Sequence, residues 1–447
     1  MTNTTLPTPA AEEVRPRRPI VAAVIGNAIE WYDFSVYAFF ATYIAANFFV
    51  EGDTTQGLIA TFMVFAVGFI ARPIGSLVGG LIGDRAGRRS ALMLSLVLMG
   101  AGMLVVAATP PVVAIGLLAP ILLLVGRLLQ GFAIGAEIGG AAAFIIEHAP
   151  EKKRSSQAAW LQASMGMANL LSAVIGLIIT TAFPADTVTE WAWRIPFIFG
   201  LVIIPIGLYI RRSLPETPVF RAQVQRLSVR ATLKHLFVDN WQNLLAGFVF
   251  AVPWHLSIYC FVVFGPTYYR IATGLAFPAN ESFAASIAGN ICLVIGCVVS
   301  GRVADRVGRK RVLVVFALVL LVLPISALLL LHAVPTFPVL LIVHSLLCLN
   351  VSMLAGVAPS TLPMLFPPAV RATGMSISFN TAAIVAAAFT PALLTWAIGA
   401  VSVYSPAILA AVGALISLAS ITWIFRRLRR VPTTANDTDL SSQLTEV

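Results

Sequence analysis

Two arginines lie where a charge is costly. Arg72 and Arg127 stand inside long apolar runs, each roughly 10–12 residues from one end of its run, or about 15–18 Å deep at 1.5 Å per helical residue. An intramembrane charge costs several kcal/mol unless it is paired or hydrated, so both side chains should face a central cavity or an internal partner. Because guanidinium geometry matches a carboxylate, the pair predicts either an anion site or a structural ion pair.

Carboxylates gather on one face of the first apolar run. Gly26, Glu30, Asp33 and Tyr37 are spaced by 4, 3 and 4 residues, which places them on one side of a helix. Two carboxyls one turn apart in a low dielectric repel each other, so one of them should hold a proton firmly. Glu137 is a third acid inside an apolar run. The three acids are candidates for proton coupling or for neutralising the buried arginines, and both roles fit different stages of one cycle.

Uncharged polar side chains occur in several other apolar runs. In that setting a polar group either completes a binding site or is satisfied within the core. The candidates to bind substrate beside the two arginines are Asn27, Tyr37, Gln130 and Gln162 in the first half of the chain and His255, Tyr259, Asn290 and Asn380 in the second. The four cysteines lack CxxC spacing, so we expect neither a metal site nor a cofactor.

A basic motif that contains glycine occurs twice. Residues 80–89 read Gly-x3-Asp-Arg-x-Gly-Arg-Arg, and residues 301–310 repeat the pattern 221 positions later with a final Lys. A second echo, a Pro followed four residues later by Arg, links 150–154 with 367–371. Two echoes in register indicate duplication and a parallel pair of halves.

The repeated loops have a mechanical interpretation. An aspartate at the cytoplasmic end of a span can pair with an arginine across the gap between helices, and breaking that pair would open the inner side. Plain topology charges would explain the arginines but not the repeated Asp and Gly. We therefore expect a cytoplasmic gate formed by Asp84, Arg85, Arg88, Arg89, Glu147, Arg154, Asp305, Arg306, Arg309 and Arg371.

Long apolar helices must position these residues. Charged residues make up 11% and apolar residues 59% of the chain, whereas a soluble domain is about a quarter charged. The surplus apolar surface must face lipid. Twelve runs can span a membrane, near 19–44, 56–83, 90–108, 114–146, 157–182, 192–211, 241–269, 283–301, 312–333, 336–364, 371–398 and 402–425.

The predicted fold is therefore an all-α polytopic membrane protein with twelve transmembrane helices in two pseudo-symmetric six-helix bundles. The spans and polar stretches divide the chain into an N-tail (1–18), an N-terminal bundle (19–211), a cytoplasmic connector (212–240), a C-terminal bundle (241–426) and a C-tail (427–447).

The placement of charge predicts the orientation. Basic clusters lie in the two tails and in alternate loops, while the intervening short loops carry acids. This is the positive-inside pattern, and it places both termini in the cytoplasm, with the chain in a bacterial inner membrane. The net charge of +10 is thus a topology signal, so we expect membrane lipid around the chain and no nucleic-acid partner. We expect the protein to act as a monomer.

The combined motifs resemble those of a known group of carriers. The repeated loop resembles the best-known motif of the major facilitator superfamily, and Gly-Arg-x2-Gln-Gly at 126–131 resembles the fourth-helix motif of its proton-coupled members. Residues 26–37, 72–75 and 193–197 are similar to the metabolite:proton symporter family, whose members carry citrate, 2-oxoglutarate, shikimate, and proline or betaine. The resemblance covers residues 19–426 and implies alternating access, with substrate bound between two bundles near the midplane.

The sequence departs from this family in two places. Met364 stands where the family often has glutamate, three residues before Pro367. An ion pair on the second-half side of the gate is therefore expected to be absent or replaced. In the eleventh span, Ala388 and Phe389 stand where the family usually has Gly-Gly.

The residues and the resemblance favour proton-driven uptake of a small organic acid, a di- or tricarboxylate such as citrate or 2-oxoglutarate. Sodium is the alternative coupling ion. Symport of a zwitterionic osmolyte such as proline or betaine is an alternative function, and the short tail 431–447, which has no heptads, argues against it. Efflux by proton antiport is a second alternative function, and the first-span motif argues against it. With no His-Glu-x2-His or Gly-x-Ser-x-Gly motif in the sequence, an enzyme is not expected.

Overall fold

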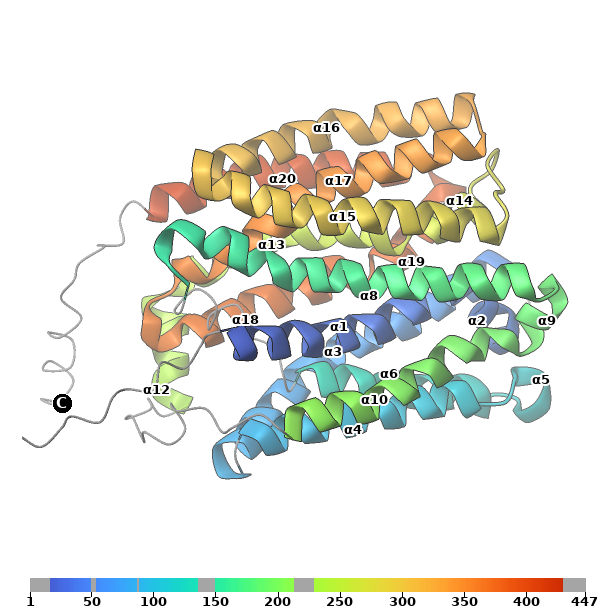
Figure 1. The fold of residues 1–447 in the computed structure, drawn as a ribbon, viewed down its shortest axis with the longest axis horizontal. Helices are drawn as coiled ribbons and strands as arrows, with labels where there is room; N and C mark the ends of the chain where they lie inside the picture. Colours follow the sequence, from blue (N-terminus) through green and yellow to red (C-terminus); the bar gives the residue numbers. More distant parts are fainter. Residues whose placement is uncertain (1–16, 50–53, 87, 136–148, 213–228, 429–447) are drawn as a thin grey trace, which may run out of the picture.

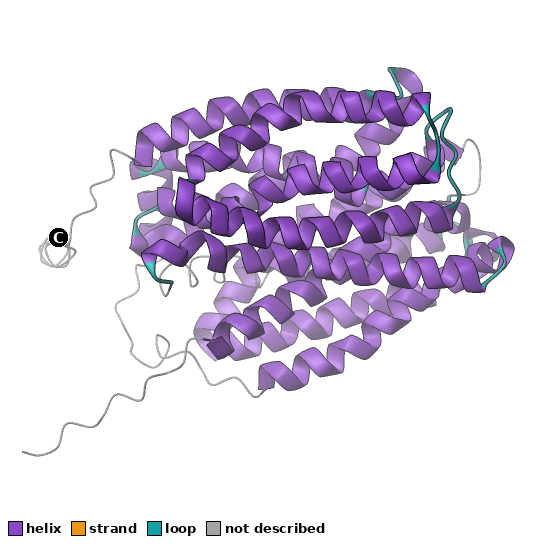
Figure 2. Ribbon diagram, turned by 45° about the horizontal axis from the view of Figure 1, so that its top comes forward, coloured by secondary structure: helices purple, strands orange, loops and turns teal. Residues whose placement is uncertain are grey.

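The fold is a bundle of long helices. The computed structural model describes residues 17–49, 54–86, 88–135, 149–212 and 229–428. In these ranges every regular element is a helix. Figure 1 shows the long helices lying side by side, and Figure 2 shows the same bundle turned, with short loops at its two ends.

The first half of the chain supplies six traverses of the bundle. They are α1 (Arg17–Phe39) with α2 (Ala41–Phe48), α3 (Thr54–Ala86), α4 (Arg88–Ala108), α6 (Leu118–Gly135), α8 (Arg154–Ala182) and α10 (Ile195–Arg212). The short elements between them are α5 (Val112–Ile115), η1 (Glu151–Lys153), α9 (Ala185–Glu190) and η2 (Ala192–Arg194).

The second half supplies six more, two of which contain π-helical turns. They are α13 (Trp241–Ser257) with η4 (Ile258–Val263) and α14 (Gly265–Ile271), α15 (Ala279–Val307), α16 (Arg309–Ala333), α17 (Phe337–Thr361) with η5 (Leu362–Leu365), α18 (Arg371–Ala382) with η7 (Ala383–Ala387) and α19 (Thr390–Ala400), and α20 (Ser405–Leu428). The short elements are α12 (Val229–Lys234), η3 (His235–Asp239) and η6 (Pro368–Val370).

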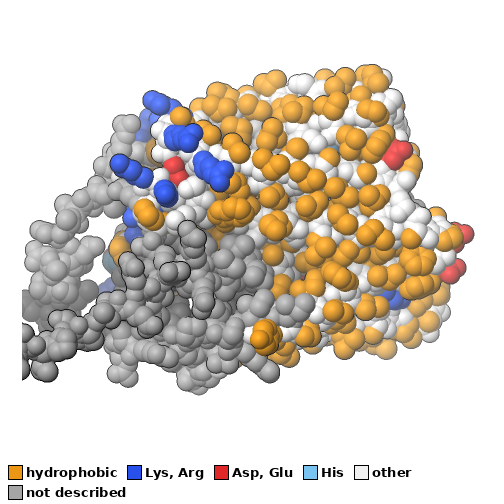
Figure 3. Space-filling model, in the orientation of Figure 1, with side chains coloured by type: hydrophobic (Ala, Val, Ile, Leu, Met, Phe, Trp, Pro, Cys, Tyr) orange, Lys and Arg blue, Asp and Glu red, His pale blue; other side chains and the backbone are white. Residues whose placement is uncertain are grey.

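The bundle has the composition of a membrane-spanning body. Among the described residues, ten helices are long and apolar enough to cross a membrane. The α1–α2 pair and α4, with its apolar stretch Met93–Ala108, complete twelve traverses. Figure 3 shows hydrophobic side chains over the flank and Lys and Arg gathered at one end. We call the end where α1 begins and α20 ends the basic end, and the opposite end the far end. The predicted fold class is confirmed.

The two halves meet through equivalent helices. The fifth traverse, α8, packs along α15 and against α17, whereas the second traverse, α3, packs against α19 and η7. Second and fifth traverses of one half thus face fifth and second traverses of the other, as a pseudo-twofold relation requires. We call the contact between the halves the seam.

The repeated sequence motifs form matching local structures. η1 follows Pro150 and leads into α8, and η6 follows Pro367 and leads into α18. In the second copy of the basic motif, α15 ends before Gly308, whose φ of 94° is in the left-handed region. Glycine takes this conformation without a steric penalty from Cβ, which allows α16 to begin at once.

Glycines bring α3 and α6 into backbone contact. A Cβ atom on Gly131 would overlap the carbonyl oxygen of Gly68, and one on Gly135 would overlap that of Arg72. Small residues permit this close approach in lipid. The contact fixes the part of α3 that carries Arg72 against the part of α6 that follows Arg127.

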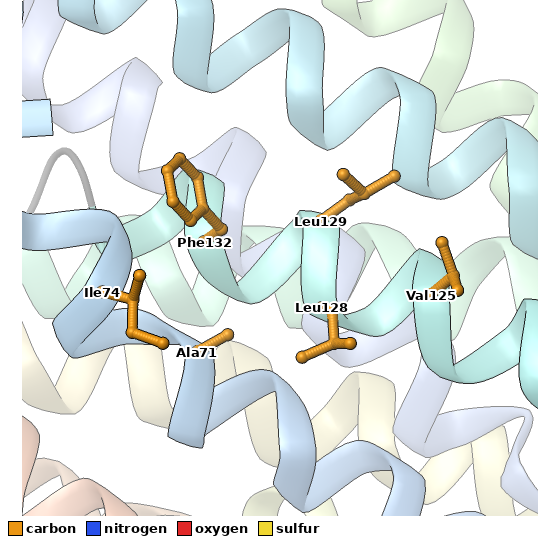
Figure 4. Close-up of a pocket in the computed structure, with 6 residues that line it drawn as sticks. All are labelled: Ala71, Ile74, Val125, Leu128, Leu129 and Phe132. Atoms are coloured by element: carbon orange, nitrogen blue, oxygen red, sulfur yellow. The ribbon is translucent and has the colours of Figure 1, made fainter. Parts of the chain in front are cut away.

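A shallow apolar groove lies on the lipid-facing side of this contact (Figure 4). Its lining consists of Ala71, Ile74, Val125, Leu128, Leu129 and Phe132. Ile74 is 61% exposed, so the groove opens outward from the bundle. With an apolar lining it cannot bind a charged solute, and the charged side chains of α3 and α6 lie elsewhere.

We predict that Gly131→Ala weakens the α3–α6 contact. The added methyl group meets the Gly68 carbonyl, and overpacking of this kind costs about 1–3 kcal/mol. The purified variant should therefore unfold at a lower temperature than wild type in detergent. Gly399→Ala is the matched control, because nothing lies within 4 Å of a Cβ there. Equal melting temperatures for the two variants would contradict the packing role.

Candidate functional site

A buried cluster of polar side chains joins α1 to α6. Arg127 Nη1 donates to Gln130 Oε1 at 2.8 Å, and Gln130 Nε2 donates to Asp33 Oδ1 at 2.6 Å. Arg127 Nη1 also lies 3.7 Å from Asp33 Oδ2. All three side chains are fully buried. Gln130, one turn after Arg127, therefore bridges the ion pair and holds the two charges in a fixed arrangement.

Aromatic rings enclose both guanidinium groups. Arg127 Cζ lies 4.4 Å from the ring centroids of both Phe34 and Tyr37. Arg72 Cζ lies 4.0 Å from the Phe69 centroid and 4.7 Å from the Phe34 centroid. Ring faces attract cations, most strongly where water is excluded. Since Phe34 contacts both arginines, the two guanidinium groups share one aromatic enclosure.

The cluster keeps unused hydrogen-bonding capacity. Among the described residues, Arg127 Nε and Nη2 have no hydrogen-bond acceptor and Asp33 Oδ2 has no donor. Buried polar groups are nearly always hydrogen-bonded, and an unmet one on a charged group is costly. A carboxylate could accept from two guanidinium donors at once. The unused donors therefore make Arg127 a candidate to bind an anion.

The second half contributes the facing wall through η4. The Tyr259 ring lies 5.6 Å from Phe69, 6.2 Å from Phe65 and 6.4 Å from Trp31, measured between ring centroids. Its hydroxyl is close enough to the Arg72 guanidinium to interact with it. Tyr259 is buried, so the site lies in the seam with both halves contributing side chains.

His255, one turn before Tyr259, extends this wall to α18. Its Nε2 lies 3.1 Å from the Phe379 carbonyl oxygen, and the two rings lie 4.4 Å apart. The His255 and Tyr259 rings lie 6.3 Å apart, measured between centroids. The structure thus brings together six of the ten predicted substrate-binding residues, which are Tyr37, Arg72, Arg127, Gln130, His255 and Tyr259.

The four amide candidates on other faces separate into two groups. Asn27 donates to Ser164 Oγ and to a backbone carbonyl of α8, both at 2.9 Å, so it joins α1 to α8. Gln162, Asn290 and Asn380 are buried, and each has a side-chain oxygen without a donor among the described residues. Gln162, Asn290 and Asn380 therefore keep the capacity to bind a ligand or water, whereas Asn27 contributes to helix packing in this conformation.

Part of the predicted site falls outside the described residues. Glu137 and Glu147 lie there, as do the side chains of Glu30, Asp84, Arg85, Arg88 and Arg89. Of the three predicted proton-coupling acids, the structure therefore places Asp33. The roles of the others stay predictions.

At the basic end, described gate residues close the α8–α15 contact. Asp305 Oδ1 and Oδ2 accept hydrogen bonds from the backbone N–H groups of Ser155 and Ser156, each at 2.9 Å. Arg309 Nε donates to Ser155 Oγ at 3.0 Å, and its Nη1 contacts Met364 Sδ. The carboxylate thus binds the N-terminus of α8, where the helix dipole favours a negative charge. The sequence had predicted an arginine as its partner.

The other described gate candidates occupy matching positions. Arg154 and Arg371 are the first residues of α8 and α18. Arg306 is exposed in the last turn of α15. Met364 fills the place of the missing glutamate with a thioether, which is only a weak acceptor for Arg309.

The aromatic enclosure is the part of the site that sequence reasoning missed. Phe65, Phe69 and Arg72 are spaced by 4 and 3 residues on α3, so one helix face carries all three. That spacing was a usable signal. In an apolar run, however, aromatic residues are expected everywhere, and only the position of Arg72 distinguishes this face.

The geometry defines a class of protein: a helical membrane protein of two six-helix halves with a charged site in the seam between them. The family model of the Major Facilitator Superfamily matches residues 23–363 and, in a second match, residues 285–445. This chain belongs to the Major Facilitator Superfamily. As predicted, it belongs with transporters and not with enzymes.

Individual relatives are similar over most of the chain. The citrate-proton symporter of Salmonella typhi is 34% identical over 424 residues, covering 95% of this chain and 97% of that protein. The proline/betaine transporter of Escherichia coli strain K12 is 32% identical over 392 residues, covering 85% and 77%. The xylose transporter XylE from E. coli, in a partially occluded inward-open structure, has a TM-score of 0.71 at 16% identity, covering 93% and 99%. This last likeness concerns the fold alone.

We predict that Asp305→Ala frees the first turn of α8. The variant loses two hydrogen bonds to a charged group, and amide exchange there should accelerate about tenfold, which corresponds to about 1.4 kcal/mol. Hydrogen–deuterium exchange of the peptide containing Ser155 and Ser156 measures this effect. Arg302→Gln is the control, because Arg302 is exposed on the preceding turn of α15. Equal exchange in both variants would show that Asp305 does not hold the helix.

We also predict strong coupling between Asp33 and Arg127. Asp33→Asn leaves a buried guanidinium without its counter-charge, which costs about 3–5 kcal/mol. The double variant Asp33→Asn/Arg127→Gln removes both charges and should be more stable than Asp33→Asn alone. Unfolding of the four proteins in detergent completes the cycle. If the loss of stability in the double variant equals the sum of the losses in the two single variants, a structural ion pair is ruled out.

Proposed function

We propose that this protein is a proton-coupled symporter that takes up a small organic acid, a di- or tricarboxylate, by alternating access of its two halves. The observation that carries the proposal is the buried Arg127, which has two unused donors in an aromatic enclosure shared with Arg72. An unmet guanidinium edge in the seam is suited to bind a carboxylate in two-point fashion.

The proton has a place in the charge balance of this cluster. Asp33 carries one negative charge, while Arg72 and Arg127 carry two positive ones. A bound dicarboxylate would add two negative charges, and one proton on Asp33 would restore neutrality. Because uncompensated charge is costly at this depth, substrate and proton should bind together. Glu30, one turn before Asp33, is the second candidate to carry a proton; if it is ionised as well, neutrality with a dicarboxylate requires a second proton.

The relatives support transport of either of two solute classes. One is named a citrate-proton symporter and another a proline/betaine transporter. The aromatic rings favour the second class in one respect, because quaternary ammonium groups bind ring faces. In this site, however, Phe34, Tyr37 and Phe69 already pack on the arginines. The acid therefore remains the better fit, with the osmolyte as the alternative.

The orientation completes the proposal. Lys and Arg side chains gather at the basic end (Figure 3), where α1 begins and α20 ends. We therefore place this end in the cytoplasm of the inner membrane by the positive-inside rule. The two bundles 19–211 and 241–426, joined by the connector 212–240, would be the moving bodies. We propose a monomer as the functional unit.

Uptake by purified protein in proteoliposomes tests the function. Citrate, 2-oxoglutarate, other dicarboxylates, shikimate, proline and betaine are each offered with and without an inwardly directed pH gradient. We expect at least one acid to accumulate faster with the gradient. A sodium gradient at equal pH on both sides tests the alternative ion. If betaine or proline accumulates and no acid does, the osmolyte function holds. If neither the pH gradient nor the sodium gradient accelerates uptake of any solute, symport is refuted.

Arg72 should be needed for this transport. Arg72→Gln removes the charge and leaves a polar amide on a shorter side chain, and kcat/KM for the acid should fall about 100-fold, or about 2.7 kcal/mol. Arg311→Gln is the matched control, since Arg311 is exposed at the basic end. Both variants should melt as folded proteins in detergent. Full transport by a folded Arg72→Gln protein would make Arg72 structural.

A further inference from the structure

Arg270 forms a bond between the two halves at the far end. It lies on α14 in the second half, and its Nη1 donates to Thr42 Oγ1 on α2 in the first half at 2.6 Å. Its Cζ lies 4.8 Å from the centroid of the Tyr43 ring. Arg270 and Thr42 are both partly exposed, so the contact lies near the molecular surface and not in the buried site.

The neighbours of Arg270 tie α14 to its own half. The Tyr268 hydroxyl donates to the Val403 carbonyl at 2.9 Å. The Tyr269 hydroxyl lies 2.9 Å from His344 Nδ1 on α17. Two consecutive residues therefore anchor α14 within the second half, and the next one reaches across the seam.

Thr42 is anchored to the first half in the same way. Asn47, on the following part of α2, donates to the Thr189 carbonyl of α9 at 2.7 Å. Phe48 packs on Trp193 with ring centroids 5.8 Å apart. The Arg270–Thr42 bond thus joins two bodies that are braced separately, and it must break when the halves separate at this end.

Around this bond the closure is aromatic. Phe39 and Phe40 of the first half pack on Phe283 of α15, with ring centroids 6.3 and 5.5 Å apart. Aromatic pairs tolerate a range of separations, whereas a hydrogen bond weakens steeply outside a narrow range of geometry. Among these contacts, Arg270 is the one that can distinguish a closed far end from an open one.

Arg194 shows that an arginine at the far end need not act in this way. Its Nε, Nη1 and Nη2 donate to the carbonyl oxygens of Ala107, Glu190 and Thr109 at 3.1, 3.0 and 3.0 Å. All of these partners belong to the first half. Arg194 therefore braces the loops of one half, whereas Arg270 crosses the seam.

We propose that Arg270 is a positioning residue that latches the far end. Its bond to Thr42 holds the halves together when the substrate site is closed on that side, and the bond breaks each time the site opens there. The inference rests on the alternating access of the proposed function, but it concerns the gate and is independent of which solute is carried.

A cysteine in place of Ser286 reports opening without any substrate. Ser286 is buried on α15, one turn beyond Phe283, so a membrane-impermeant thiol reagent on the far side reaches it only when the aromatic closure opens. In Ser286→Cys protein with the four native cysteines replaced by alanine, Thr42→Val should raise the labelling rate at least about tenfold, since it removes a hydrogen bond to a charged group. Arg270→Lys keeps a charged donor and should label at an intermediate rate.

Thr181→Val is the matched control for this experiment. Thr181 lies near the far end of α8, and its hydroxyl donates to the Leu177 carbonyl of its own helix at 2.8 Å. It should leave the labelling rate unchanged. Equal labelling of the Thr42→Val and Thr181→Val proteins, including no labelling of either, would overturn the latch.

Bridging the two positions tests the same claim from the other direction. In Thr42→Cys/Arg270→Cys protein, a short bis-methanethiosulfonate reagent, which forms a disulfide bond with each cysteine and releases sulfinate, should stop uptake, and reduction of the disulfides should restore it. Bridged Asn47→Cys/Thr189→Cys protein, in which both positions belong to one half, should continue to transport. Full uptake by the bridged Thr42/Arg270 pair would refute the latch. Absence of uptake by the protein with Thr42 and Arg270 intact would count against the proposed function instead, and the labelling experiment then decides the latch alone.

Discussion

The constraint on which the rest of the structure depends is the cost of holding guanidinium groups inside apolar helices. Asp33 and Gln130 satisfy one edge of Arg127, and ring faces cover the planes of Arg127 and Arg72. Glycine contacts such as Gly131 on Gly68 bring α3 and α6 close enough for both arginines to share this enclosure. Without that neutralisation, burial at this depth would oppose folding by several kcal/mol.

The two halves are alike in backbone and different in chemistry. Equivalent helices meet at the seam, and a short 3-10 turn precedes both α8 and α18. The charges of the described site, however, all belong to the first half, while the second half contributes His255 and Tyr259. The duplicated scaffold is thus suited to symmetric movement of the two halves. Binding of a charged substrate and a proton would take place beside the helices of the first half, so only the residues of that half need to suit proton coupling.

Much of this architecture could be predicted, because spans, basic loops and repeats are local properties of the sequence. The shared face of Asp33 and Tyr37 was predicted from spacing, and both contact Arg127. Choices of partner were harder. Asp305 binds backbone N–H groups, which every helix N-terminus offers and no side-chain pattern reveals. The π-helical turns η4 and η7 contact α1 and α3 of the opposite half, and contacts between residues so far apart in sequence leave no local pattern.

The two ends of the molecule are closed by interactions of different kinds, and the difference bears on how it switches. At the basic end, Asp305 holds two backbone amides and Ser155 accepts from Arg309. At the far end, aromatic packing surrounds the hydrogen bond from Arg270 to Thr42. These bonds set the balance between the two closed forms, with several hydrogen bonds to charged groups at the basic end against the Arg270 contact at the far end. Reversing a population from 1:99 to 99:1 requires about 5.5 kcal/mol, which substrate and proton would have to supply by binding one form more tightly than the other. Neither bundle has to change its fold for this.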